Sequence, residues 1–224
     1  MLMTAERARA AQPSDVSDSA LVLARRAALA LASMSKRVHP AWIASLGRDV
    51  ETVAVNRPAL LDELLLSRFD LRWPDLSAAS HGPEYMWLLP PEQVKRVCSA
   101  RALYTWRDAL DRCVVAQVRR TARALVGDVA FKTLLARSDP RPHSVTLPES
   151  LDADEVCAFG WSQLKAGLPW RDARSCRLVD LMLPPVKVAE SPGAVDDHAL
   201  FMADLPAMFP ELLWLFGSNP ATTT

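Results

Sequence analysis

The sequence predicts a mainly α-helical fold, an irregular helical bundle arranged around one long helix. Half of its 224 residues are hydrophobic and 23% are charged, a composition typical of globular proteins. Apolar residues recur at three- and four-residue spacing in several segments, which is the pattern of an amphipathic helix. With 7 glycines against 17 prolines, the chain has few residues suited to tight β-turns and many that mark element boundaries.

The N-terminal region divides into a flexible segment and a first helix. Residues 1–19 are polar and alanine-rich, and we expect them to be flexible. Asp18 or Ser19 is placed to cap a helix that runs to about Lys36, because short polar side chains accept hydrogen bonds from the free N–H groups of a first turn. The apolar set of this helix is Leu21, Val22, Leu29 and Leu31, with Arg25 and Arg26 outside it.

Two shorter helices are predicted next. Pro40 suits the first turn of one of them and holds His39 extended, and Gly47 is placed to end it. Residues 58–69 begin with proline and repeat leucine at helical spacing, which predicts the second. Its inward stripe is Leu61, Leu64, Leu65 and Phe69. Residues 71–91 are rich in turn and cap signals and are predicted to be irregular.

Residues 92–125 carry the strongest periodic signal and are predicted to form the long central helix. Apolar residues follow three- and four-residue spacing along this whole segment. Gly127 is predicted to break the helix, and a short helix is expected from Val129 to Ala136. The predicted stripe is Val94, Val97, Leu103, Trp106, Leu110, Cys113 or Val114, Val118, Ala122 and Leu125.

The C-terminal part contains one well-marked helix and two less certain segments. Ser150 or Asp152 is placed to cap a helix that stops at Gly167. Periodicity does not decide whether the run from Cys176 to Leu183 is strand or helix, so a small strand pair around 178–188 stays open. Residues 195–216 are predicted to form one or two short helices broken at Pro206 and Pro210.

We expect one helical domain over residues 20–217, followed by a tail at 218–224. A subdivision near residues 138–150 stays open, because that segment reads as a linker or surface loop. The formal net charge is zero, but residues 92–137 hold ten Lys/Arg and four Asp/Glu, whereas residues 138–224 hold six and twelve. Such an asymmetry could offer patches of opposite sign to partners, but we interpret it as a solvated helix face and a solvated acidic tail.

Cysteine usage and the N-terminal sequence predict a cytoplasmic protein. Cys98, Cys113, Cys157 and Cys176 are too sparse for a secreted disulfide scaffold, so we expect reduced thiols. The first twenty residues have no apolar core of a signal peptide, and no apolar run approaches the ~18 residues that a membrane span requires.

No sequence motif predicts a catalytic or metal site. Phosphate-binding loops, a nucleophile elbow and zinc-protease spacing are all missing from the sequence, and we expect no cofactor. The histidines are scattered at His39, His81, His143 and His198. The most site-like cluster is Asp196-Asp197-His198, which we interpret as the acidic N-terminus of a helix. An enzyme that combines this cluster with a distant cysteine stays open as an alternative.

Tryptophans and arginines supply the candidate partner-binding residues. Seven tryptophans are present, of which Trp106 and Trp161 fit the core. The other candidates, Trp42, Trp73 and Trp87, flank prolines in an irregular region, where an exposed aromatic ring is a natural interface anchor. The basic cluster Arg119, Arg120 and Arg123 favours contact with an acidic partner surface. A regulator that binds nucleic acid through this basic helix stays open as an alternative.

Three segments in order resemble one known family. They are VHPAWI (38–43), then WRDAL (106–110) with a glycine break before FKTLL (131–135), and finally FPELLWLFG (209–217). Together they resemble the K component of bacterial type III secretion systems, the SctK/YscK family, in its plant-pathogen-type (Hrp) branch. The resemblance covers residues 20–217, and its most distinctive motif is the His-Pro turn.

The resemblance implies a non-enzymatic cytosolic adaptor of the sorting platform beneath the injectisome. Such a protein lies peripheral to the inner membrane and bridges the cytoplasmic domain of the ring D component and the pod-forming Q component. It implies no nucleic-acid ligand and no membrane insertion, and it leaves the oligomeric state open. In this interpretation Pro40 fixes the chain, while His39 and Trp42 contact either the body or a partner. A secretion chaperone fits less well, because those are typically small acidic dimers.

Overall fold

The computed structural model describes residues 13–47, 50, 52, 56–71, 82–136, 146–168, 170, 172–185 and 197–216. Within these ranges every regular element is a helix, which confirms the mainly α-helical prediction. The elements are α1 (Pro13–Leu31), η1 (Met34–Lys36), α2 (Pro40–Ser45), α4 (Pro58–Arg68), η2 (Pro83–Leu88), α5 (Pro91–Thr105), α6 (Arg107–Asp111), α7 (Ala116–Val126), α8 (Asp128–Ala136), α9 (Ala153–Gly167), α10 (Ala173–Met182), α11 (His198–Met208), η3 (Pro210–Leu212) and α12 (Leu213–Phe216).

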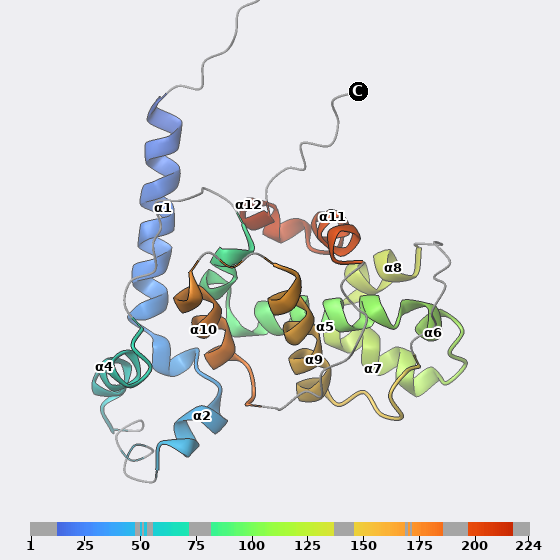
Figure 1. The fold of residues 1–224 in the computed structure, drawn as a ribbon, viewed down its shortest axis with the longest axis horizontal. Coiled ribbons are helices and arrows are strands. Elements are labelled where there is room, and N and C mark those ends of the chain that lie inside the picture. The colour runs from blue at the N-terminus through green and yellow to red at the C-terminus, as the bar shows by residue number, and fades with distance from the viewer. Residues whose placement is uncertain are drawn as a thin grey trace, which may run out of the picture.

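The helices form an elongated body with α5 and α9 at its centre. Figure 1 shows α1, α2 and α4 at one end of the long axis and α6, α7 and α8 at the other. The most extensive contact between described elements joins α5 to α9. The two helices approach closely where Gly160 faces the backbone of Cys98. A side chain at Gly160 would overlap the Cys98 carbonyl, so only glycine fits at this position. Trp106 stacks on Phe159 at the end of the same interface, with ring centroids 4.8 Å apart.

The predicted long helix at residues 92–125 is wrong, because this segment forms three helices. Helix α5 ends at Thr105, α6 is short, and the chain is not helical from Arg112 to Val115. The segment Cys113–Val115 ends in two β-branched residues, which weakens helix formation there. The break lets α7 fold back on α5, where Ala122 and Val126 are fully buried. A straight helix of this length would leave that apolar face in water.

The first helix starts earlier than predicted and buries a different face. Helix α1 begins at Pro13, so neither Asp18 nor Ser19 caps it. Leu31 is buried as expected, together with Leu23 and two alanines of the same face. The other predicted inward residues, Leu21, Val22 and Leu29, are 70%, 51% and 62% exposed. Periodicity failed here because α1 is apolar on two opposite sides.

The run Cys176–Leu183 is settled as helix. Helix α10 begins after Asp172, whose carboxylate accepts a hydrogen bond from the Arg174 N–H at 2.9 Å, and it ends at Met182. The alternative strand pair around 178–188 is therefore wrong for its helical part, and residues 186–188 lie outside the described ranges. All four cysteines are free thiols.

Several local predictions at helix ends are confirmed. Pro40 opens α2, and His39 before it is extended, with φ −61° and ψ 135°. Gly127, with φ +89°, separates α7 from α8, a conformation that favours glycine. Asp152 caps α9 by accepting hydrogen bonds from the N–H groups of Asp154 and Glu155, both at 3.0 Å. Each of these features depends only on residues within four positions of one another, which is why the sequence predicts it.

The C-terminal elements pack onto the body through apolar side chains. Pro206 lies inside α11 without breaking it, contrary to expectation, whereas the chain does change direction at Pro210. Phe201, Phe209 and Leu215 are buried. In the described residues no single helix is long and apolar enough to cross a membrane. Helix α11 with Pro210–Phe216 meets that test only as a pair bent by 102°.

Candidate functional site

The His-Pro turn, the most distinctive motif of the sequence, contacts the body of the protein. The N–H of His39 donates a hydrogen bond to the Leu181 carbonyl at 2.8 Å, and the indole N–H of Trp42 donates to the Leu183 carbonyl at 2.9 Å. The His39 ring also caps α2, because its Nδ1 accepts from the Ala41 N–H at 3.3 Å. These bonds tie the N-terminal helices to the end of α10. The motif therefore has a structural role at this junction.

The three candidate tryptophan anchors have different outcomes. Trp87 is only 1% exposed, so it does not present the exposed ring expected of an interface anchor. Its carbonyl instead accepts a hydrogen bond from the guanidinium of Arg37, which also donates to the Leu89 carbonyl at 2.7 Å. Trp42 is partly buried and contacts Phe69 edge-on. Trp73 lies outside the described residues. The irregular region thus contributes core, because η2 turns its aromatic side chains inward.

The predicted arginine cluster lines a groove between α7 and α8. Arg119, Arg120 and Arg123 lie there with Lys132, which the sequence argument did not include. The groove has a volume of about 480 Å³. We name it the basic groove, and it is lined by Arg119, Arg120, Arg123, Phe131, Lys132, Leu135 and Ala136. Lys132 was missed because only the turn at Gly127 brings α8 beside α7.

The three arginines of the basic groove are held in different ways. Arg119 donates hydrogen bonds to the carbonyls of Leu110 and Asp111, at 3.4 Å and 3.1 Å, and so caps the end of α6. Arg123 forms an ion pair of 2.5 Å with Asp128, and Arg120 donates to the Gln117 amide oxygen at 2.9 Å. Arg119 is therefore fixed by the backbone, whereas Arg120 and Arg123 contact only exposed side chains through the bonds described here.

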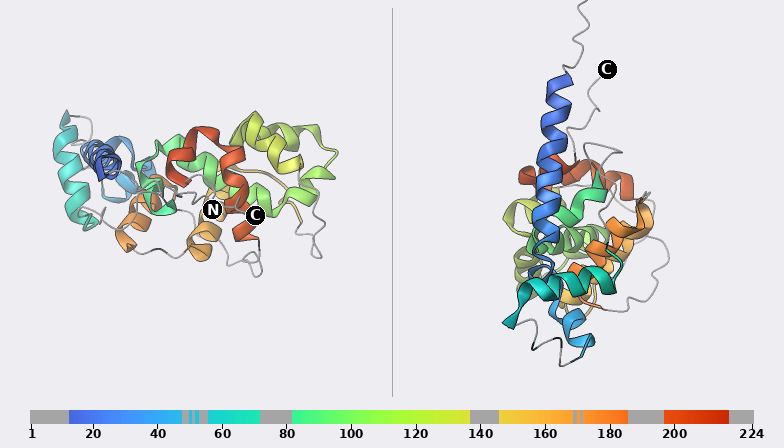
Figure 2. Two further views of the ribbon diagram at one scale, coloured as in Figure 1. Left: turned by 90° about the horizontal axis from the view of Figure 1, so that it is seen from above. Right: turned by 90° about the vertical axis from the view of Figure 1, so that its left-hand side faces the viewer.

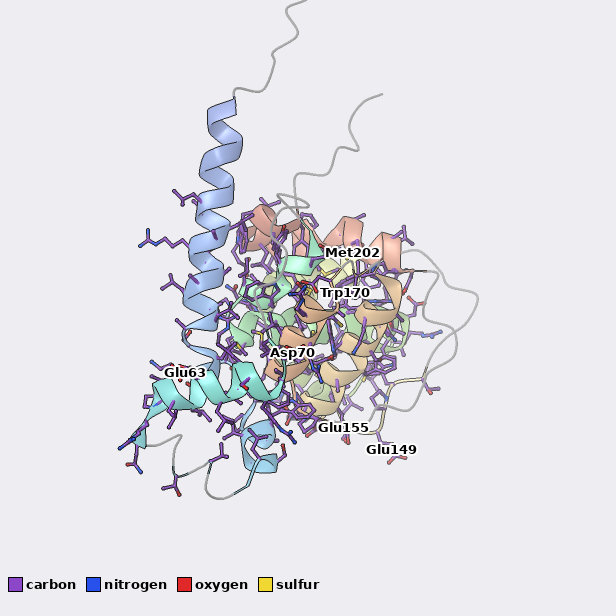
Figure 3. The ribbon with its side chains drawn as sticks, turned by 60° about the vertical axis from the view of Figure 1, so that its left-hand side comes forward. Glu63, Asp70, Glu149, Glu155, Trp170 and Met202 are labelled. Atoms are coloured by element: carbon purple, nitrogen blue, oxygen red, sulfur yellow. The ribbon has the colours of Figure 1, made fainter. Side chains whose placement is uncertain are left out.

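A second surface, which helical periodicity assigns to the core, runs along α1. Leu21, Arg25 and Leu29 are spaced four residues apart and Val22 lies beside them, so they share one side of the helix. We name these four residues the α1 stripe. Figure 3 shows α1 carrying side chains on the side turned away from the body. The helix is anchored through its other side, where the Arg26 guanidinium lies 4.0 Å from the centre of the Trp214 ring.

The acidic cluster before α11 forms an ion pair inside the protein. The Asp197 carboxylate lies 2.6 Å from the guanidinium of Arg101, whose side chain is fully buried. Asp197 stands at the N-cap position as predicted, but its side chain makes no cap hydrogen bond. His198 packs against Gly167, and neither of its ring nitrogens has a hydrogen-bond partner in the described part of the structure. Asp196 lies outside the described residues.

The half-buried position of His198 predicts a loss of stability in mild acid. Burial, and then the nearby Arg101 charge, lower the pKa of His198 below its ordinary 6.5, against the opposing effect of Asp197. The unfolded chain therefore binds this proton more readily, so stability is lost as pH falls below about 6.5. We expect denaturant unfolding of wild type to lose more free energy between pH 7.5 and 5.5 than that of His198→Gln.

The His39→Gln variant provides the comparison for this measurement. Burial also lowers the pKa of His39, with a raising contribution from Asp154 and a lowering one from Lys95. Replacing each histidine separately, and then both, apportions the acid sensitivity between them. An unchanged pH dependence in the His198→Gln variant would contradict the assignment to His198.

Among the described residues, no group of three or more His, Cys, Asp or Glu side chains is placed to hold a metal ion. Burial raises the pKa of the Cys176 thiol to about 11, and a nearby Asp180 carboxylate adds to this effect. Such a thiol carries little thiolate at neutral pH and is a poor nucleophile.

One comparison with known proteins identifies the family. The model of a family described as bacterial type III secretion protein (HrpB4) matches residues 13–211. Searches of curated proteins and of solved structures give no significant match. The matched range includes the His-Pro turn, the central helices, the α1 stripe and the basic groove, and it confirms the resemblance to a secretion component of the Hrp branch. The chain therefore belongs to the HrpB4 family of bacterial type III secretion proteins.

Proposed function

We propose that this protein is a non-enzymatic cytosolic adaptor of a type III secretion sorting platform. In this proposal it lies peripheral to the inner membrane and bridges the ring D component and the pod Q component. The observation that carries the proposal is the presence of two chemically different surfaces at opposite ends of the elongated body. Figures 1 and 2 show α1 at one end of the long axis and α7 with α8 at the other.

Each of the two surfaces has the character of a binding site. The α1 stripe exposes Leu21, Val22 and Leu29 to water, and adjacent exposed apolar residues are typical of interaction sites. The basic groove gathers cationic side chains around apolar ones, which favours an acidic partner through charge complementarity. Because the two surfaces belong to distant helices, two partners bound there would not compete. An adaptor requires this separation.

The bridging function is tested by variants that should each lose binding to one partner and retain the other. The tagged protein, expressed in its native cell under secretion-inducing conditions, is expected to co-purify with both the D and Q components. Leu21→Glu/Leu29→Glu should abolish recovery of one component, because it places charge on the α1 stripe. Arg120→Glu/Arg123→Glu should abolish recovery of the other, because it reverses the charge of the basic groove.

Leu200→Glu is the control, since Leu200 is an exposed apolar residue of α11 outside both surfaces. It should retain both components. Recovery of neither component by the wild-type protein, or of both by the two end variants, would refute the bridging function. Recovery of nucleic acid in place of these proteins would favour the regulator alternative.

A further inference from the structure

We propose that the basic groove binds an acidic protein segment. In this proposal, an apolar side chain that lies between two carboxylates of the segment enters the groove. The inference rests on the proposed adaptor function and adds the chemistry of the ligand at one end of the bridge. The groove volume of about 480 Å³ lies within the range of ~300–1,000 Å³ common for ligand sites. It is open to solvent along α7 and α8 and is accessible to a partner chain.

The charges of the groove are largely available to a ligand. Four cationic side chains from two helices line it, and among its described lining residues none carries a carboxylate. The neighbouring Asp128 pairs with Arg123, but both side chains are about half exposed or more. Such surface pairs contribute little and exchange readily. Carboxylates of a partner can therefore replace the Asp128 contact and pair with Arg120 and Lys132.

Arg119 gives the groove a fixed positive wall beside an apolar floor. Its two hydrogen bonds to the end of α6 hold the guanidinium, which lies 6.0 Å from the centre of the Phe131 ring. A guanidinium that is already held loses less conformational entropy when a ligand binds. Leu135 and Ala136, beside the buried Phe131 ring, add exposed apolar surface that carboxylates alone cannot cover. The ligand must therefore carry apolar atoms between its charges.

The same floor argues against nucleic acid as the occupant. Base stacking requires an exposed aromatic face, but Phe131 is only 7% exposed. A second copy of this chain is a weaker candidate than a different protein. The acidic segment at the start of α9 carries Leu151 among its carboxylates, but Leu151 packs against the core of its own chain. An acidic segment of another protein remains, and it matches both the charge and the apolar floor.

Binding of two designed peptides to the purified full chain tests this chemistry. The first is a labelled peptide of Glu residues with two leucines four positions apart, and the second has serines at those positions. We expect the leucine peptide to bind at least about tenfold more tightly by fluorescence anisotropy. Arg120→Glu/Lys132→Glu should weaken it by roughly tenfold or more, because two attractions become repulsions. Arg174→Glu, at an exposed position of α10 outside the groove, should leave binding unchanged.

Equal affinity for the two peptides would overturn the proposal, since it would show that the groove binds acidic peptides through charge alone. Displacement of the leucine peptide by oligothymidine at lower concentration than by unlabelled peptide would overturn it in favour of nucleic acid. Circular dichroism of each variant checks that the helical fold is retained.

Photo-cross-linking in the native cell separates this inference from the adaptor function. A photoreactive residue in place of Lys132, with the same residue at Arg174 as control, should capture an acidic segment that contains Leu or Phe. If that segment belongs to a protein outside the secretion apparatus, the groove chemistry stands and the bridge fails. If the D and Q components co-purify but no acidic segment is cross-linked at Lys132, the bridge stands and the groove inference fails. A cross-link to another copy of this chain would overturn the choice of partner.

Discussion

Replacement of Gly160 by alanine is expected to destabilise this protein severely. A Cβ atom at this position would lie 1.7 Å from the carbonyl oxygen of Cys98 and 3.0 Å from the backbone nitrogen of Ala102. Both atoms belong to the backbone of α5, which cannot rotate away, so α5 and α9 would have to separate. Overpacking of a core usually costs about 1–3 kcal/mol, and we expect this clash to reach or exceed the upper end.

The direction of this effect distinguishes packing from helix propensity. Propensity alone predicts that alanine stabilises a helix by roughly 1 kcal/mol relative to glycine. Urea unfolding followed by circular dichroism and by tryptophan fluorescence would measure the difference. Gly167→Ala is the matched comparison in the same helix, because its Cβ would meet the side chain of His198 at 2.4 Å. A ring can shift where a backbone cannot, so we expect the smaller loss there. A Gly160→Ala variant as stable as wild type would show that the close approach is wrong.

The second large effect is expected from Asp197→Ala. This change removes the carboxylate that lies 2.6 Å from the fully buried guanidinium of Arg101. Arginine stays charged at any pH at which the protein folds, so the positive charge remains in the interior after this carboxylate is lost. Removing one member of a buried ion pair typically costs ~3–5 kcal/mol. We expect a loss of this size in the free energy of unfolding.

A double variant tests whether the loss comes from the unbalanced charge. Arg101→Met/Asp197→Leu replaces the pair by apolar groups, which is often nearly neutral for stability. It should recover most of what Asp197→Ala loses. Hydrogen exchange should locate the damage, with amides of α11 losing protection before those of α5, because the pair joins these two helices. A loss below about 1 kcal/mol in Asp197→Ala would contradict the role of the pair.

Asp197 and His198, the described members of the acidic cluster before α11, both make structural contacts. The Asp197 carboxylate is engaged by Arg101, and His198 is packed against Gly167 at the end of α9. Both side chains therefore hold α11 on the body. The two proposed binding surfaces lie at the ends of the body, where charged and apolar side chains face solvent.

Of the candidate residues proposed from the sequence, the arginines are placed together on the surface. Arg119 and Arg123 are four residues apart on α7 and Arg120 lies beside them, so helical periodicity alone puts them on one side. The sequence could not add Lys132, which reaches the same groove only because Gly127 reverses the chain. The His-Pro turn was recognised as distinctive, but its hydrogen bonds to Leu181 and Leu183 span more than 140 residues of sequence.

Features that depend on neighbouring residues are predictable from the sequence alone. The extended His39 before Pro40, the Asp152 cap and the glycine break at Gly127 each follow from the conformational limits and hydrogen bonding of a few consecutive residues. The tertiary structure alone decided which side of α1 faces water, where the segment 92–125 folds back, and that Asp197 pairs with Arg101. These outcomes depend on contacts between residues far apart in the chain. The buried side of a helix with two apolar sides, and the choice of Asp197 between capping α11 and pairing with Arg101, depend on which elements pack against them.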